Sequence, residues 1–209
     1  MGGFIVGQKK CDSDFAKHPG KHPFCHPLVL ASGSARRQEL LKIIWPHHFT
    51  VAPQDIDETP LKDELPTQYI KRVTLAKADS AIRQNPNATV LTSDTVVAVG
   101  RRILQKAADV DEARWQMNLI SGRRHRVLTG VAVRFPGQKV RFRLAQTRLS
   151  IARMTDAQIN AFIESNEWKG VAVYRLQGLF GRFVKSISGQ PATVLGLPLF
   201  ETAALLQLP

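Results

Sequence analysis

Residues 28–44 constrain the fold most, because they predict a strand, a tight turn and a helix in direct succession. Leu28, Val29 and Leu30 form an apolar run that ends at small residues, which is typical of a buried strand. Ser34 is predicted as the N-cap of the next helix, whose buried face is expected to carry Leu40, Leu41, Ile43 and Ile44. Such a unit forms a ready anion site, since the first N–H groups of a helix have no partner within it.

Arg36 and Arg37 fall in the first turn of this predicted helix. Positive charge there opposes the helix dipole, at a cost of up to about 1 kcal/mol for each side chain. An anion held between the helix end and the two guanidinium groups would remove this cost. The alternative is a pair of solvated arginines that tolerate a poor position. The working hypothesis is a polyphosphate site.

The charge of the chain also points to an anionic ligand. With 209 residues it fits one large domain or two closely packed lobes, and its formal net charge is +12. This charge attracts nucleic acid, an anionic membrane or a small phosphorylated substrate. No apolar run approaches the roughly 18 residues that span a bilayer, no signal sequence opens the chain, and two cysteines form no disulfide framework. These features predict a soluble, cytoplasmic protein without a membrane partner.

Residues 1–27 differ from the rest, because Gly, Lys, His and Pro dominate and no apolar period emerges. They are predicted to be a disordered extension, or the product of a misplaced start codon, before one domain over residues 28–209. A zinc site is the alternative, with Cys11, His18, His22, Cys25 and His26 as candidate ligands. The spacing disfavours zinc, since there is no close cysteine pair.

Two polar features precede the central strand. Asp55, Asp57 and Glu58 could hold a hard divalent cation through their oxygens, and a solvated acidic turn is the alternative. In a helix predicted over residues 66–83, Lys77 interrupts an apolar face. A desolvated ammonium there needs an anion, although a lysine can also extend its charged end to water.

Asp94 lies inside a buried-strand pattern over residues 88–100. A carboxylate there needs a hydrogen-bonded partner, a cation or a raised pKa. A catalytic base or a metal ligand is the preferred interpretation, and a structural aspartate that braces a turn is the alternative.

Gln177 could bind a nucleobase edge or be satisfied by neighbouring backbone. The remaining pattern predicts helices ending at residue 120 and over 155–163 and 196–206, and strands over 127–135, 140–151 and 183–187.

Five motifs in order resemble the Maf family, a group of nucleoside triphosphate pyrophosphatases historically linked to inhibition of septum formation. They occupy residues 30–41, 93–97, 119–130, 177–178 and 196–199, and the resemblance covers about residues 28–207. It implies an α/β fold like that of ITPase, with an elongated, mixed, twisted sheet, flanking helices and two lobes around a central cleft. It also implies hydrolysis of the α–β phosphoanhydride of a nucleotide with a divalent metal cation, Mg²⁺ or Mn²⁺.

The resemblance assigns roles to individual residues. Asp94 matches the proton acceptor that activates water, and Glu58 matches a carboxylate of the metal region that Asp94 shares. Lys77 and Lys106 match two lysines near the triphosphate. The implied substrate-binding residues are Ser32, Ser34, Arg36, Arg37, Thr95 and Gln177.

Three of these positions, Arg36, Thr95 and Gln177, resemble the branch that acts on dTTP and UTP, and modified pyrimidine nucleotides are further candidate substrates. The branch that acts on 7-methyl-GTP carries Trp, Gln and Glu there. The family often forms dimers, so a homodimer is expected.

The chain also departs from the family pattern. Ala35 replaces a proline, and residues 105–107 read Gln-Lys-Ala in place of Gly-Lys-Pro. Residues 170–174 lack the usual lysine and have Ala172 in place of a glycine, so a positive φ at Ala172 would strain the loop. These departures leave open a non-catalytic or weakly active nucleotide-binding protein linked to cell division. The net charge leaves open a basic nucleic-acid-binding protein, which the lack of a stacking motif disfavours.

Overall fold

The computed structural model describes residues 26–208. The predicted extension over residues 1–27 and its zinc alternative therefore lie outside the described residues, apart from His26 and Pro27. The carbonyl of Pro27 already accepts a hydrogen bond from the Thr89 N–H at 2.9 Å, so the described chain enters the sheet at once. Among the described helices, none is both long enough and apolar enough to cross a membrane.

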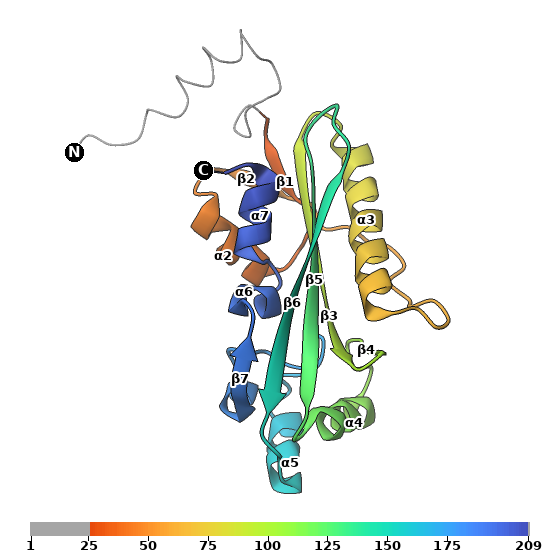
Figure 1. Ribbon diagram of the computed structural model, residues 1–209, viewed down its shortest axis with the longest axis vertical. Helices are drawn as coiled ribbons and strands as arrows, with labels where there is room; N and C mark the ends of the chain where they lie inside the picture. Colours follow the sequence, from red (N-terminus) through yellow and green to blue (C-terminus); the bar gives the residue numbers. More distant parts are fainter. Residues whose placement is uncertain (1–25, 209) are drawn as a thin grey trace, which may run out of the picture.

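A mixed, seven-stranded sheet runs along the long axis of the molecule (Figure 1). Its strand order is β2-β1-β3-β5-β6-β7, with β4 (Arg102–Leu104) beside β3 and β7 (Val184–Ser188) at one edge. β1 (Leu28–Leu30) is parallel to β2 (Phe49–Val51) and β3 (Thr89–Val99), and the other pairs are antiparallel. The strands β3, β5 (Arg124–Arg134) and β6 (Arg141–Ile151) have 11 residues each and extend about 36 Å at 3.3 Å per residue. The predicted elongated α/β fold is confirmed.

Helix α2 (Ala35–Ile44) begins after Ser34, whose side-chain oxygen accepts a hydrogen bond from the Arg37 N–H, so the predicted N-cap is confirmed. Leu40 and Leu41 are buried, but Ile43 is 67% exposed and its predicted burial is wrong. Successive helical residues are about 100° apart, so residues 40, 41 and 44 share one face and residue 43 points away from it.

The helices cover the sheet at different levels. α3 (Pro66–Gln84) packs on β3 and β5, whereas α2 and α7 (Leu199–Leu206) lie together near β1 (Figure 1). The lower end holds β4 (Arg102–Leu104), α4 (Val110–Ile120), α5 (Asp156–Glu164), the 3₁₀ helix η2 (Leu179–Phe183) and β7 (Val184–Ser188). The helix predicted over residues 196–206 is α7, which begins at Leu199. A further helix that the sequence did not predict, α6 (Pro191–Leu195), precedes it and ends at Gly196, whose φ is 104°.

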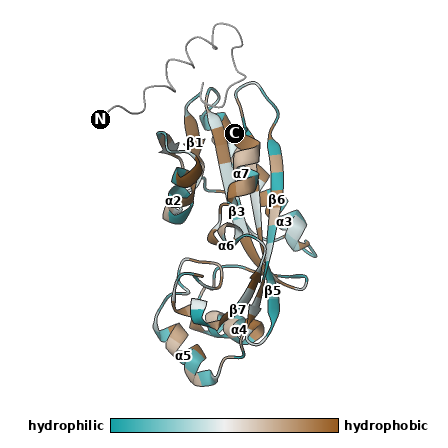
Figure 2. Ribbon diagram, turned by 60° about the vertical axis from the view of Figure 1, so that its left-hand side comes forward, coloured by the Kyte–Doolittle hydropathy of each residue, from teal (hydrophilic) through white to brown (hydrophobic). Residues whose placement is uncertain are grey.

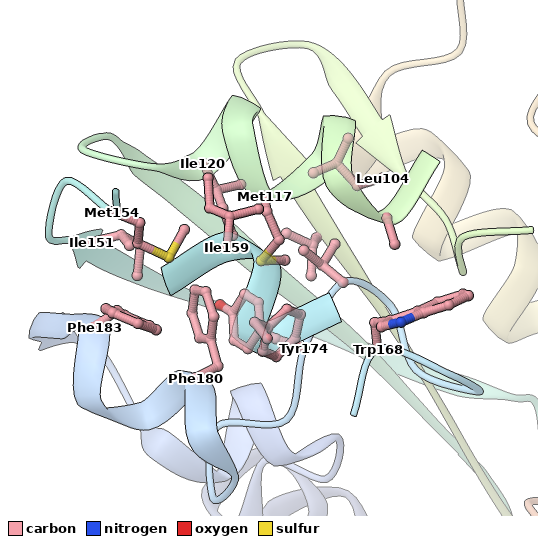
Figure 3. Close-up of a cluster of buried hydrophobic side chains, with 14 of the residues drawn as sticks. Leu104, Met117, Ile120, Ile151, Met154, Ile159, Trp168, Tyr174, Phe180 and Phe183 are labelled. Carbon is pink, nitrogen blue, oxygen red and sulfur yellow. The ribbon is translucent and has the colours of Figure 1, made fainter. Parts of the chain in front are cut away.

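Two main hydrophobic clusters give the molecule its two lobes. The upper lobe buries residues of β1, α2 and α7, including Leu30, Leu41 and Leu206. The lower lobe buries a larger set around α4, α5 and η2, part of which Figure 3 shows. Figure 2 shows hydrophilic and hydrophobic segments alternating along α5, as expected of a helix with one buried face.

Aromatic stacking organises the lower lobe (Figure 3). Phe180 is fully buried, and its ring stacks on that of Tyr174 with the two centroids 3.9 Å apart. It also packs edge-on against Phe162 and Phe183. Tyr174 belongs to a loop that ends at η2. The core of this lobe therefore fixes that loop.

We expect Phe180→Ala to lower the free energy of unfolding by about 3–5 kcal/mol, since it removes a fully buried ring and leaves a cavity. Urea denaturation followed by circular dichroism measures this change. Phe200→Ala is the matched control, because Phe200 is 65% exposed, and its effect should stay within about 0.5 kcal/mol. Equal effects of the two substitutions would contradict the assignment of Phe180 to the core.

Candidate active site

A cavity of about 830 Å³ lies where the two lobes meet. One wall is the turn between β1 and α2, with Ser32, Gly33 and Ser34. The wall formed by the lower lobe contains residues 104–106 and 170–175. This volume is within the range of about 300–1,000 Å³ that is typical of small-molecule sites. The central cleft implied by the resemblance is therefore present.

Arg37 holds three distant segments together beside this cavity. Its Nη1 donates to Ser32 Oγ at 3.0 Å, its Nε to the Gly196 carbonyl at 2.9 Å and its Nη2 to Thr95 Oγ1 at 3.3 Å. Nη2 also lies 3.6 Å from Asp94 Oδ1. Burial lowers the pKa of Arg37, and the nearby carboxylates of Asp94 and Glu58 oppose that shift. A guanidinium so extensively bonded acts as a brace for the site.

Arg36 lines the same cavity but, in contrast to Arg37, its side chain is not bonded to the described part of the protein. Its side chain is half-buried and has no hydrogen bond or ion pair with any residue in the described part of the chain. The structure therefore separates two arginines that the sequence had treated as a pair. Arg36 is available to a ligand, whereas Arg37 is already bonded to the protein.

Lys77 joins the two carboxylates of the site. Its Nζ lies 2.8 Å from Glu58 Oε1 and 3.0 Å from Asp94 Oδ1. Lys77 is only 8% exposed and Asp94 7%, so the ammonium finds the anion that its buried position requires. The alternative in which Lys77 extends to water is wrong. Because Lys77 comes from α3 and Asp94 from β3, the ion pair also fixes the helix to the sheet.

Close packing of α3 on the sheet makes this ion pair reachable. Gly130 on β5 is the register partner of Asp94. A Cβ atom at Gly130 would collide with the hydroxyl of Thr74, which precedes Lys77 by one turn on α3. Glycine at this position therefore allows the helix to approach the strand that carries Asp94.

Of the three carboxylates in the acidic segment, only Glu58 lines the cavity. Asp55 and Asp57 are exposed, and Asp57 Oδ1 accepts a hydrogen bond from the Thr59 N–H at 2.8 Å. The hydrogen bonds from Thr59 hold the pKa of Asp57 below its usual value. The solvated acidic turn therefore describes Asp55 and Asp57, and Glu58 alone joins Asp94. No group of three or more potential metal-ligating His, Cys, Asp or Glu side chains occurs within residues 26–208.

The neighbours of Asp94 on β3 connect it to the upper lobe. Ser93 Oγ donates to the Gly196 carbonyl at 2.7 Å, and the hydroxyls of Thr95 and Thr129 lie 3.0 Å apart. The Gly196 carbonyl thus accepts from both Ser93 and Arg37. The sequence alone does not predict this role of Gly196, although the motif over residues 196–199 includes the residue.

Lys106 and Gln177, both predicted site residues, lie in different places. Lys106 lines the cavity and is exposed, and its backbone forms an isolated antiparallel bridge with Ala172. Gln177 is exposed and does not line the cavity. Cavity-lining residues that sequence reasoning missed are Tyr69, Gln105, Tyr174 and Arg175.

The unusual loop over residues 170–174 carries its strain at a different residue from the one expected. Val173, and not Ala172, has a positive φ of 71°. A β-branched side chain rarely adopts this conformation. Val173 is also 1% exposed and belongs to the hydrophobic cluster of the lower lobe, so packing holds the strained backbone in place.

His125 supports this loop from β5. Its Nε2 forms a hydrogen bond with the hydroxyl of Tyr174, and both side chains are buried. Burial lowers the pKa of His125 to about 4 and raises that of Tyr174. The imidazole is therefore neutral in the fold, and its buried Nδ1 has no hydrogen-bond partner among the described residues.

The two arginines predict different stability effects. Arg37→Ala removes bonds to three segments and leaves Asp94 with one cation fewer, so unfolding should become easier by about 2–4 kcal/mol. Arg36→Ala removes no such bond and should change the free energy of unfolding by less than about 0.5 kcal/mol. Urea denaturation of both variants measures the difference. Equal losses in the free energy of unfolding would contradict the structural role assigned to Arg37.

His125 predicts a specific dependence of stability on pH. Its pKa is about 4 in the fold against an ordinary value of 6.5, so the unfolded chain binds more protons between these values. Stability from this group is complete above about pH 6.5 and is lost as the pH falls toward 4, by up to about 3 kcal/mol.

Comparison of wild type with His125→Gln isolates this contribution from that of the carboxylates. We expect the difference in free energy of unfolding between the two proteins to change between pH 7 and pH 4. His48→Gln is the control, since His48 is exposed. A difference that stays constant over this range would show that His125 does not titrate as stated.

Comparison with known proteins agrees with these features. A family model described as a Maf-like protein matches residues 27–208. A dTTP/UTP pyrophosphatase of Mesorhizobium japonicum is 46% identical over 186 residues, which cover 86% of this chain and 89% of that protein. A dTTP/UTP pyrophosphatase of Caulobacter vibrioides is 44% identical over 180 residues, covering 86% and 93%.

Among solved structures, a HAM1 protein from Coxiella burnetii matches with a TM-score of 0.45 and 17% identity, over 62% of this chain and 74% of that chain. The family model covers nearly all of the described residues, and the two sequence relatives exceed 40% identity over most of their length. The chain belongs to the Maf family.

Proposed function

We propose that this protein hydrolyses dTTP, UTP and modified pyrimidine nucleotides to the nucleoside monophosphate and pyrophosphate. The observation that carries the proposal is the group of Asp94, Lys77 and Glu58 in a cavity whose other cations include Arg36 and Lys106. Two relatives with 46% and 44% identity are named dTTP/UTP pyrophosphatases. Cationic walls suit a polyphosphate, and one central carboxylate suits proton transfer.

In the proposed reaction, Asp94 accepts a proton from the water that attacks the α-phosphorus. The new P–O bond forms as the α–β bridging P–O bond breaks, and the electron pair leaves with pyrophosphate. Arg36 and Lys106 bind phosphate oxygens, and Lys77 neutralises negative charge next to Asp94. Ser32 and Ser34 offer hydroxyls at the turn before α2, and Arg37 keeps this turn next to Asp94.

Glu58 and Asp94 are the residues that would hold a divalent cation. Mg²⁺ commonly takes one or two carboxylates and completes its coordination with substrate phosphates and water, so two carboxylates facing one cavity fit it. When bound, such a cation neutralises phosphate charge and favours attack at phosphorus. We expect weak binding of Mg²⁺ or Mn²⁺ alone, since the protein offers two carboxylates that already pair with Lys77.

The preference for a pyrimidine base rests on Arg36, Thr95 and Gln177. Arg36 and Thr95 line the cavity, and Thr95 is positioned by bonds to Arg37 and Thr129. Gln177 lies outside it, so a contact of Gln177 with the base requires the segment over residues 176–178, which follows Arg175, to move inward. The homodimer and the cytoplasmic location stay predictions.

Pyrophosphate release from UTP, dTTP, CTP, GTP and dATP, with Mg²⁺ or Mn²⁺, tests the activity. We expect UTP and dTTP to be the best substrates and Asp94→Asn to lower kcat by about 10²–10⁴, as expected for loss of a general base. Asp79→Asn, an exposed residue of the same acidic type on α3, is the control and should retain full activity.

Three outcomes would reject parts of this proposal. Release from none of the nucleotides, with tight UTP binding by calorimetry, would favour the non-catalytic alternative. Equal activity of Asp94→Asn and wild type would remove Asp94 as the base. Steeply salt-dependent binding of nucleic acid, unaffected by Arg36→Ala, would favour the nucleic-acid alternative.

A further inference from the structure

The cations that line the cavity fall into two groups. Arg37 and Lys77 lie against the carboxylates of Glu58 and Asp94. The second group has no ion pair with any residue between 26 and 208, and its members are Arg36, Lys106 and Arg175. A cavity with three uncompensated cations is suited to a ligand with several negative charges. Arg175 has no role in the function proposed above.

Arg175 is half-buried in the cavity wall of the lower lobe. Its guanidinium makes one hydrogen bond within the described chain, from Nη2 to the Lys169 carbonyl at 3.3 Å. A guanidinium has five N–H donors, so most of this group is free to bind a ligand. Its planar geometry matches two oxygens of a phosphate at once.

The backbone that carries Arg175 is firmly held. The preceding residue, Tyr174, stacks on Phe180 and bonds to His125. A few residues earlier, Ala172 forms its backbone bridge with Lys106, which places this second unpaired cation beside the same loop. The protein therefore presents Arg175 from an anchored position, which reduces the entropy lost when it binds a ligand.

The two lobes thus offer unpaired cations from opposite elements. Arg36 comes from the first turn of α2 in the upper lobe, and Arg175 comes from the loop of the lower lobe. Val171 lines the same wall and carries no charge, so Arg175 is the cation that residues 170–175 contribute to the cavity.

We propose that Arg175 is a substrate-binding residue that contacts the phosphate chain of the nucleotide from the lower lobe, next to Lys106 and across from Arg36. This inference rests on the function proposed above and adds a residue to its site. It assigns to Arg175 a contact with phosphate, and none with the base or with the reacting water.

Kinetics with UTP test the contact. We expect Arg175→Ala to raise KM for UTP roughly tenfold to hundredfold, as for the loss of a charge-assisted hydrogen bond, with a smaller change in kcat. Arg175→Lys should fall between this variant and wild type. Arg153→Ala is the control, because Arg153 is exposed and lies outside the cavity, so it removes the same charge without the contact.

Binding of inorganic pyrophosphate and of uridine, each measured by calorimetry, identifies the part of the substrate that is bound. Arg175→Ala should weaken pyrophosphate binding and leave uridine binding unchanged. The double variant Val171→Lys/Arg175→Ala returns an ammonium to the same wall and should recover part of the pyrophosphate affinity. A purely structural role of Arg175 would give no such recovery.

Two results would overturn the inference: unchanged KM and pyrophosphate affinity in Arg175→Ala, or weaker uridine binding with unchanged pyrophosphate binding. Either result in an active wild-type enzyme rejects the role of Arg175 alone. A wild-type protein that releases no pyrophosphate from any nucleotide rejects the proposed function, and calorimetry with pyrophosphate still decides whether Arg175 binds phosphate.

Discussion

The bonds of the Arg37 guanidinium hold the site together. They connect the turn after β1, the centre of β3 and the end of α6, three segments that are far apart in sequence. A lysine could not replace this arrangement, because its single ammonium cannot direct donors to three separate oxygens in fixed directions. The first turn of α2 is an unfavourable place for a cation, and the ring of acceptors around Arg37 offsets that penalty.

The charged residues of the cavity fall into two groups: those paired with each other, and cations that have no such pair among the described residues. Lys77 and Arg37 are matched by Asp94 and Glu58, so the buried groups are compensated within the protein. The remaining cations line the same cavity and have no carboxylate partner within residues 26–208. Two arginines that are adjacent in sequence therefore have opposite functions: Arg37 maintains the shape of the site, and Arg36 is free for a ligand.

The sequence was sufficient to predict local features but could not show how they meet in space. The N-cap at Ser34 and the buried setting of Asp94 follow from the pattern of residues, whereas the mixed sheet is what the resemblance to the Maf family implies, and the structure has all three. The difference between Arg36 and Arg37 could not be predicted, because it depends on which face of α2 meets the Gly196 carbonyl, 159 residues from Arg37. The separation of Glu58 from Asp55 and Asp57, and of Gln177 from the cavity, likewise depends on turn geometry.

The lower wall of the cavity is continuous with the core of its lobe, and this explains how a strained loop persists there. A positive φ at a valine costs on the order of 1–3 kcal/mol, and full burial of a valine side chain returns a similar amount, about 1.5–3 kcal/mol. The burial of Val173 thus offsets the strain of its backbone, and Tyr174, Phe180 and His125 pack around the loop. Replacing Val173 with alanine would lose packing energy and relieve little of the backbone strain, because alanine also disfavours a positive φ. Only glycine would remove the strain. The wall that presents Arg175 is thus determined by the same contacts that stabilise the lobe.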